Sequence, residues 1–324
     1  MKAVICKQFG PPEQLVVEEV DDLTPGAGEV LIDVKSVPVT FPDTLMLEDK
    51  YQFKVPLPYI PGGEVSGVIA ALGDGVGDRR VGERVVASTG FAGGFAEQAL
   101  AKAGDARPLP DSVGFAESTG LGYAYGTTYY GLKHRARLQA GESLLILGAG
   151  GHLGMTAIEI GKLMGATVIA AASTEEKLDL CRRFGADETI NYAEESLKDR
   201  VKELTGGQGV DVVYDPVGGD YAEQAIRATA WEGRFLVVGF TAGIPSVPLN
   251  LTLLKGCSIM GVFYGAMTTK EPELNAEIMA DLLDLTATGK LEPHISARYS
   301  LDDAAVALRD MMDRKAVGKI VIEP

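Results

Sequence analysis

The feature that most constrains how this chain can fold is a glycine-rich turn, GAGGHLG, at residues 148–154. The turn follows an unbroken apolar run, SLLIL, and leads into residues 152–163, where apolar side chains recur at helical spacing. Such a run is typical of a buried parallel strand. Glycines between a strand and a helix let the backbone approach a pyrophosphate, whose charge is held by N–H groups at the helix N-terminus. The turn therefore predicts a dinucleotide site.

Strands and helices alternate behind this turn, up to about residue 240. Their order is strand TVIAAA, helix EEKLDLCRRFGA, strand ETINY, helix SLKDRVKELTGG, strand VDVVYDPVG, helix YAEQAIRATA and strand GRFLVVGF. This alternation indicates βαβ units and a doubly wound parallel sheet of the α/β class. The first 120 residues have short apolar runs broken by glycine and proline, which indicates a β-rich domain. We expect residues 125–265 to form a Rossmann dinucleotide-binding domain, and residues 1–124 with 266–324 to form the other domain.

The tip of the second strand indicates which dinucleotide binds. An acidic side chain usually stands there and binds a ribose 2′-hydroxyl, but this chain has Ala172, Ser173 and Thr174. The absence of that acid removes its repulsion of a 2′-phosphate. Glu175 and Glu176 are contrary evidence, but we expect them to point to solvent and to stabilise the helix N-terminus. Ser173, Lys177 in the next helix and Tyr192 at the end of the third strand can donate hydrogen bonds to it. The pattern favours NADPH over NADH.

Charge and cysteine content exclude several other classes of function. The net charge is −15 and no cluster of lysine or arginine occurs, which argues against nucleic acid or an anionic membrane as a partner. The three cysteines, Cys6, Cys181 and Cys257, are far apart and have no histidine at metal-ligand spacing. We therefore expect no disulfide framework and no zinc site. Because no leader and no apolar run of 18 residues is present, we expect a cytoplasmic protein.

Seven motifs spread along the whole chain have the order and texture of one known superfamily. They are FPDTLMLEDKYQ, LPYIPGGEVSGVI, GTTYYGL, GAGGHLG, DVVYDPVGG, RFLVVGF and LLKGCSIMGVFYG. In these motifs the chain resembles the medium-chain dehydrogenase/reductase superfamily, and within it the zinc-independent quinone oxidoreductase (zeta-crystallin-like) family. The resemblance implies a GroES-like β-rich catalytic domain beside the Rossmann sheet. The zinc-ligand positions of the superfamily's alcohol dehydrogenases correspond to Thr40, Gly63 and Tyr123, which are poor zinc ligands.

The resemblance also implies four residues on the catalytic side of the site. Tyr51 matches a family tyrosine that lies close to the nicotinamide and the substrate. Tyr51 or Tyr123 would donate a proton or position the substrate, although Tyr123 equally suits a role as filler of the vacated metal cavity. Asp43 is expected to fix the active-site loop rather than act as a base. Thr40 stands where many quinone reductases have an asparagine, which leaves the substrate open.

A second set of residues would bind the cofactor. By the resemblance they approach the nicotinamide, hold the pyrophosphate, line the 2′-phosphate pocket or border the nicotinamide from the later loops. They are Thr127, Gly150, Gly151, His152, Leu153, Ser173, Lys177, Tyr192, Gly239, Phe240, Thr241, Val262, Phe263 and Tyr264. His152 replaces a glycine of the usual turn, and we expect it to be neutral because a helix N-terminus disfavours a cation.

Hydride transfer from NADPH to a small-molecule acceptor is the function that these patterns favour. The first prediction is a quinone acceptor, and the alternative is an enoyl thioester or another α,β-unsaturated carbonyl. A hypothesis from another class is a crystallin-like protein that binds NADPH without turning it over. The apolar segment SIMGVFY would be an exposed edge strand in a monomer, so we expect a homodimer, as in relatives that pair this edge.

Overall fold

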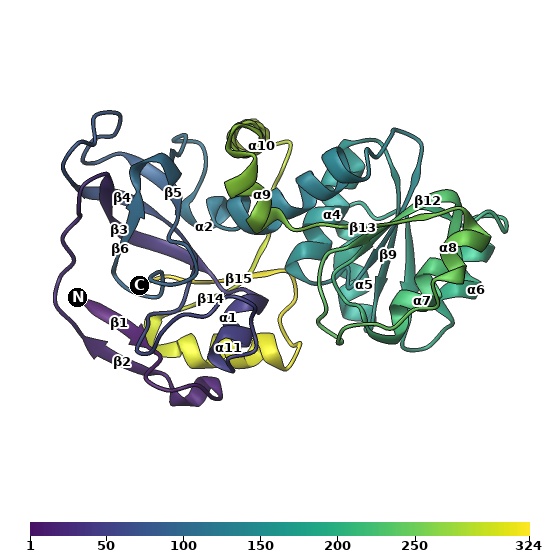
Figure 1. The fold of residues 1–324 in the computed structure, drawn as a ribbon, viewed down its shortest axis with the longest axis horizontal. Helices are drawn as coiled ribbons and strands as arrows, with labels where there is room; N and C mark the ends of the chain where they lie inside the picture. Colours follow the sequence, from purple (N-terminus) through teal and green to yellow (C-terminus); the bar gives the residue numbers. More distant parts are fainter. The chain divides into compact units, whose positions relative to one another are not determined.

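Both ends of the chain fold into one unit, and its middle forms a second. The computed structural model describes all residues 1–324. Unit 1 comprises residues 1–122 and 283–324, and unit 2 comprises residues 123–282 (Figure 1). From the sequence we expected residues 266–282 to belong to the domain that contains both chain ends. In the structure these residues belong to unit 2. One reason is that Asp281 accepts hydrogen bonds from Tyr129 (2.7 Å) and Lys133 (3.0 Å), both in unit 2.

Unit 2 contains the doubly wound parallel sheet that the sequence predicts. Its strands lie in the order β10-β9-β8-β11-β12-β13, and every neighbouring pair is parallel. The strands are β8 (Ser143–Leu147), β9 (Thr167–Ala172), β10 (Glu188–Asn191), β11 (Val210–Asp215), β12 (Thr229–Val237) and β13 (Ser258–Gly261). The helices are η3 (Leu121–Tyr125, which begins in unit 1), α3 (Gly126–Tyr129), η4 (Tyr130–Arg135), α4 (His152–Leu163), α5 (Glu175–Arg183), α6 (Leu197–Leu204), α7 (Gly219–Ala228), α8 (Asn250–Lys255), α9 (Tyr264–Lys270) and α10 (Pro272–Ala287, which ends in unit 1).

The central strand β8 is apolar from Leu144 to Leu147 because helices cover both of its faces. Leu145 and Leu147 pack into a core shared with α6, α7 and α8. Leu144 points to the other face, where α4 approaches so closely that a Cβ on Gly161 would lie 2.7 Å from its Cδ2. Burial on two faces leaves no place for a polar residue, which explains the unbroken apolar run.

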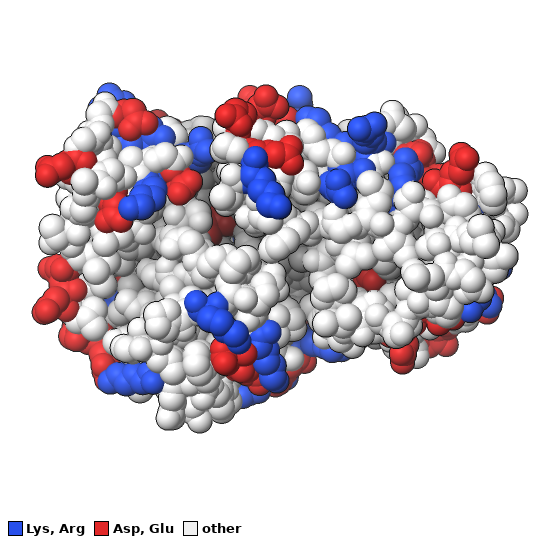
Figure 2. Space-filling model, viewed as in Figure 1, with Lys and Arg blue, Asp and Glu red and all other residues white.

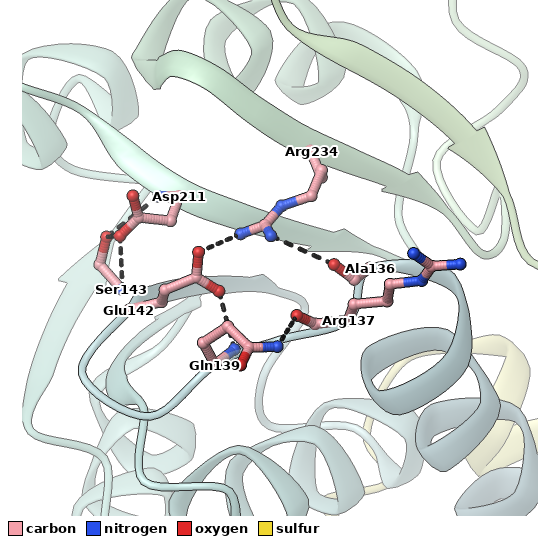
Figure 3. Close-up of polar contacts among 7 residues, drawn as sticks. All are labelled: Ala136, Arg137, Gln139, Glu142, Ser143, Asp211 and Arg234. Carbon is pink, nitrogen blue, oxygen red and sulfur yellow. Dashed lines mark hydrogen bonds and ion pairs between the residues drawn. The ribbon is translucent and has the colours of Figure 1, made fainter.

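Polar contacts at the amino end of this sheet fix how β8 begins (Figure 3). Arg234 on β12 donates to the Glu142 carboxylate (2.7 Å) and to the Ala136 carbonyl (3.2 Å). Asp211 on β11 accepts from the backbone N–H (2.8 Å) and the hydroxyl (2.7 Å) of Ser143. These contacts join β8, β11 and β12 to one another and to the loop that precedes β8. The candidate site lies at the opposite, carboxyl end of the strands.

Unit 1 is β-rich, and its main sheet has the order β14-β15-β3-β4-β5-β7, with β6 also paired to β3. Both chain ends contribute, since β15 from the C-terminal segment pairs with β3 from the N-terminal one. Its strands are β1 (Lys2–Ile5), β2 (Val16–Glu19), β3 (Glu29–Pro38), β4 (Glu64–Leu72), β5 (Arg84–Ser88), β6 (Gln98–Lys102), β7 (Ala106–Pro108), β14 (Ile295–Tyr299) and β15 (Lys319–Ile322). Its helices are η1 (Pro12–Gln14), α1 (Phe41–Leu47), η2 (Ala103–Asp105), α2 (Phe115–Ser118), η5 (Leu301–Asp303) and α11 (Ala304–Met312).

The surface carries charges of both signs. On the face shown in Figure 2, lysine and arginine side chains are interspersed with aspartate and glutamate and form no continuous basic stripe. A helix both long and apolar enough to cross a membrane does not occur in the structure.

Candidate active site

The glycine-rich turn joins β8 to α4 in a space that admits no side chain at several positions. Gly148 has a φ of +60°, and a Cβ there would lie 2.7 Å from Val217. A Cβ on Gly154 would come within 2.4 Å of the Ala149 Cα. The N-cap of α4 is Gly151, and no side chain caps the helix. The first N–H groups of α4 have no acceptor within the helix, so this end can hold an anion such as a pyrophosphate.

Lys177 lies directly across this turn. A Cβ on Gly150 would be 2.6, 2.8 and 3.0 Å from the Cβ, Cγ and Cδ atoms of Lys177, so the aliphatic part of the lysine fills the space that a side chain would take. Thr174 caps α5 by accepting from the Lys177 N–H at 3.4 Å. The neighbouring carboxylate of Glu175 pairs with Arg182 at 2.6 Å. The packing therefore holds Lys177 against the turn, while the carboxylate of Glu175 is paired with Arg182.

Ser173 and Tyr192 follow the ends of two adjacent strands. The Tyr192 N–H donates to the Ala172 carbonyl at 3.1 Å, which extends the pairing of β10 with β9 by one residue. The Ala149 N–H donates to the Ala171 carbonyl at 3.0 Å and ties the glycine-rich turn to the same strand end. The structure thus brings together the predicted residues of the pyrophosphate turn and of the 2′-phosphate pocket.

Tyr221 belongs to the same neighbourhood and was not predicted. It lies near the start of α7, and its ring centroid is 4.4 Å from that of Tyr192. Because an aromatic residue on an amphipathic helix usually packs into the core, this contact could not be predicted from the sequence. The ring of Tyr221 supports the side chain of Tyr192.

The loops after β11 and β12 are joined by backbone hydrogen bonds. Gly239 donates to the Asp215 carbonyl (3.2 Å), and Thr241 donates to the Pro216 carbonyl (3.4 Å). Phe240 between them is exposed. The β8–β11 pair is the point where the strand order reverses, and ligands of doubly wound sheets bind at the carboxyl ends of the strands at such a point. The predicted residues 239–241 lie at that end of the sheet.

The last predicted cofactor residues lie where α3 meets the segment after β13. A Cβ on Gly126 would be 2.5 Å from the ring of Tyr264, so the helix that carries Thr127 packs closely on this tyrosine. The Tyr264 hydroxyl donates to Asn275 at 2.7 Å. Val262 is buried, whereas Phe263 is exposed. Tyr264 is therefore engaged in packing, and Thr127 and Phe263 have side chains that are still in part accessible.

In unit 1, Asp43 fixes the start of α1. Its carboxylate accepts from the N–H (2.8 Å) and the hydroxyl (2.6 Å) of Thr40, and the Gly62 backbone also donates to it. Burial raises the pKa of Asp43 to about 6, and these hydrogen bonds limit the rise. These contacts tie the start of α1 to the segment at Gly62.

The segment at Gly63, one of the positions that correspond to a zinc ligand, is covered by the loop at residues 89–94. A Cβ on Gly63 would lie 2.7 Å from the Gly90 carbonyl oxygen, so a residue with a side chain does not fit at this position. Tyr123 is the first residue of unit 2 and lies in η3. The structure holds no group of three or more histidine, cysteine, aspartate or glutamate side chains that could bind a metal.

Glu64 and Lys319 are two buried ionisable side chains of unit 1 that were not predicted. Glu64 Oε1 accepts from the Gly120 N–H at 2.8 Å, and burial raises the pKa of this carboxyl to about 7. Lys319 is buried and donates to the carbonyls of Ala116 (2.8 Å) and Thr119 (2.9 Å). An acid at the start of the apolar run GEVSGVIAAL was the available signal. Together the two side chains hold the segment that leads out of unit 1.

Two family models match the chain. Residues 26–111 match "Alcohol dehydrogenase GroES-like domain", and residues 153–281 match "Zinc-binding dehydrogenase". Among solved structures, that of Escherichia coli quinone oxidoreductase complexed with NADPH has a TM-score of 0.93 at 27% identity, with all of both chains covered. A probable oxidoreductase from Mycobacterium abscessus has a TM-score of 0.91 at 36% identity, covering 100% of this chain and 99% of that one.

Among curated proteins, the chain is 39% identical over 327 residues to the quinone oxidoreductase-like protein 2 homolog of Nematostella vectensis, covering 99% of this chain and 88% of the relative. It is 32% identical over 324 residues to human quinone oxidoreductase, covering 99% and 97%. These relations extend over nearly the full length of both proteins. The chain therefore belongs to the medium-chain dehydrogenase/reductase superfamily and, within it, to the quinone oxidoreductase family.

Proposed function

We propose that this protein is an oxidoreductase that uses NADPH to reduce a quinone. The observation that carries the proposal is the position of Lys177, whose stem fills the space over Gly150 beside Ser173 and Tyr192, with no acid at the strand tip. A cation and two hydroxyl groups next to an anion-binding turn suit a 2′-phosphate.

In this proposal unit 2 holds the cofactor. The N–H groups of the first turn of α4 bind the pyrophosphate, and Lys177 with Ser173 and Tyr192 binds the 2′-phosphate. The loop at residues 239–241 and the segment at residues 262–264 orient the nicotinamide end, with Thr127. NADPH, when bound, supplies a hydride to the acceptor.

Unit 1 supplies groups for the acceptor. Asp43 and Thr40 fix the start of α1, and Tyr51 lies in the loop that follows this helix. A quinone needs little acid catalysis, because its reduced form is an aromatic alcohol. The residues therefore need only to hold the acceptor and exclude water.

Reduction of an enoyl thioester or another conjugated carbonyl is the second candidate. Such an acceptor needs a donor to its carbonyl oxygen and a proton at its α-carbon, and Tyr51 and Tyr123 are the candidate donors. If either tyrosine has this role, its replacement by phenylalanine lowers kcat for the thioester and leaves kcat for a quinone unchanged.

The deciding experiment compares the rate of NADPH oxidation by the purified protein with 1,4-benzoquinone and with the crotonyl thioester of pantetheine. Faster turnover of the quinone supports the proposal, and faster turnover of the thioester favours the second candidate. NADPH that binds, as shown by its fluorescence, but is oxidised by neither acceptor contradicts both. That result would indicate a non-catalytic, crystallin-like NADPH-binding protein.

We also propose that two copies pair through β13. This strand ends the sheet and pairs only with β12, and large apolar side chains are exposed in β12, in β13, in α8 and at the residue before α8. These side chains are Trp231, Leu249, Leu253, Leu254 and Ile259. Figure 2 shows few charges over the part of unit 2 where Figure 1 has α8 and β13. Sedimentation at micromolar protein should give a dimer, and a single-chain mass would contradict the pairing.

A further inference from the structure

Three aromatic side chains from two loops of unit 1 meet in one cluster. The rings of Phe53 and Phe91 are stacked, with centroids 4.6 Å apart and planes at 20°. The ring of Tyr51 is tilted against both, at 6.0 Å from Phe53 and 6.1 Å from Phe91. Tyr51 also packs against the core of unit 1, and Phe53 and Phe91 do not belong to that core.

The stacked pair is exposed. Phe53 and Phe91 each leave 39% of their surface accessible in the structure. Aromatic rings gain stability when they are covered, so an accessible pair at one place is typical of a binding surface rather than of a solvent-facing loop. The charge of Lys54, which follows Phe53 in the chain, is paired, because its ammonium group binds the Asp49 carboxylate at 2.6 Å. The cluster thus suits an uncharged, flat ligand.

The loop that carries Phe91 is held in place. Thr89 donates through its N–H to the Gly63 carbonyl (3.0 Å) and through its hydroxyl to the Gly62 carbonyl (3.1 Å). Further along, Gly93 donates to the Ile60 carbonyl at 2.6 Å. The Gly62 backbone also donates to Asp43. The stack is therefore preorganised next to the groups to which the proposed function assigns the acceptor.

We propose that Phe53 and Phe91 form the subsite for the ring of the acceptor, and so make the site selective for cyclic over open-chain acceptors. The inference rests on the proposed function. The electron-rich face of a phenylalanine attracts an electron-poor quinone ring, and a third ring continues the offset stack. An open-chain conjugated carbonyl of the same polarity gains only ordinary apolar contact from the same surface.

The test replaces each phenylalanine by leucine, which keeps the apolar bulk and removes the aromatic face. For Phe53→Leu and for Phe91→Leu, we expect KM for 1,4-benzoquinone to rise about 2- to 10-fold, with kcat little changed. KM for crotonyl pantetheine and the dissociation constant of NADPH should stay at the wild-type values. Phe115→Leu is the matched control, because this ring also lies in unit 1 but packs under Arg84 at 4.6 Å.

A binding measurement makes the test independent of turnover. 1,4-Dicyanobenzene is a flat, electron-poor ring like the quinone but is not reduced by NADPH, so its ring protons should broaden with wild-type protein and sharpen with the double variant Phe53→Leu/Phe91→Leu. If the wild-type protein reduces benzoquinone and the variants keep both the wild-type KM and the broadening of the probe, the subsite is overturned and the proposed function stands. Wild-type protein that reduces no cyclic acceptor would instead overturn the proposed function.

Discussion

The two units hold their candidate functional residues in different ways. In unit 2 the turn around Gly150 is made of backbone, and its charged member, Lys177, is anchored by the packing of its aliphatic part. In unit 1 the corresponding segments are held by buried carboxyl groups, those of Asp43 and Glu64, whose pKa values are raised to about 6 and about 7. Unit 2 also contains a buried carboxyl, that of Asp215, whose pKa is raised by burial, but it accepts from the Val217 and Gly218 N–H groups (2.8 Å each) and holds the loop after β11 rather than the turn. Binding at the turn should therefore depend mainly on shape, whereas pH should act on the segments that Asp43 and Glu64 hold.

The largest effect should come from filling the turn in unit 2. In Gly154→Ala the new methyl group would meet the backbone of Ala149 at 2.4 Å, and no flexible side chain is present to give way. We expect a loss of about 2–3 kcal/mol in the free energy of unfolding and at least 100-fold weaker NADPH binding. Urea unfolding and fluorescence titration measure the two effects. Gly104→Ala is the control, since a Cβ there meets nothing within 4 Å.

The next effect concerns pH and unit 1. Because the folded pKa of Glu64, about 7, exceeds the ordinary value of 4.5, the folded protein binds this proton more tightly than the unfolded chain. Stability should therefore fall by about 3 kcal/mol as the pH rises from 4.5 to 7, through this group alone. Glu64→Gln should remove that part of the slope in urea unfolding across this pH range. Glu176→Gln, at an exposed position, should keep the wild-type slope, and an unchanged slope in Glu64→Gln would contradict the assignment.

A smaller effect tests the charge of unit 2 separately from its shape. Lys177→Met keeps the stem over Gly150 and removes the ammonium group. We expect NADPH binding to weaken about 10- to 100-fold and NADH binding to change little, because only NADPH carries the 2′-phosphate. Lys198→Met, on α6, is the control. Equal weakening for both cofactors would place the ammonium at the pyrophosphate.

The smallest effect concerns the ring that supports Tyr192. Tyr221→Leu removes the ring contact at 4.4 Å, and we expect NADPH binding to weaken about 2- to 10-fold while NADH binding is unaffected. Tyr221→Phe keeps the ring and should behave like the wild type. Should the phenylalanine variant be as weak as the leucine variant, the hydroxyl of Tyr221 would itself be a ligand. Fluorescence titration with both cofactors distinguishes these outcomes.

Much of unit 2 was predictable because its signals are local. The run TVIAAA corresponds residue for residue to β9, and the helix expected after the glycine-rich turn is α4 (His152–Leu163). Residues 266–282 were placed in the wrong unit because their attachment depends on contacts such as that of Asp281 with Tyr129, which are distant in the sequence. The aromatic cluster of unit 1 could not be predicted for the same reason, since Phe53 and Phe91 come from separate loops.

The alternation of strands and helices, the glycine-rich turn and the missing acid at Ala172 can be read from the sequence, because each depends on neighbours within one or two elements. That Lys177 crosses Gly150, that Tyr221 supports Tyr192 and that Glu64 is buried follows from the packing of distant segments. These outcomes depend on which distant segments exclude water from one another. Hydrophobic periodicity does not encode this, because it reports which face of an element is buried but not which side chains lie opposite.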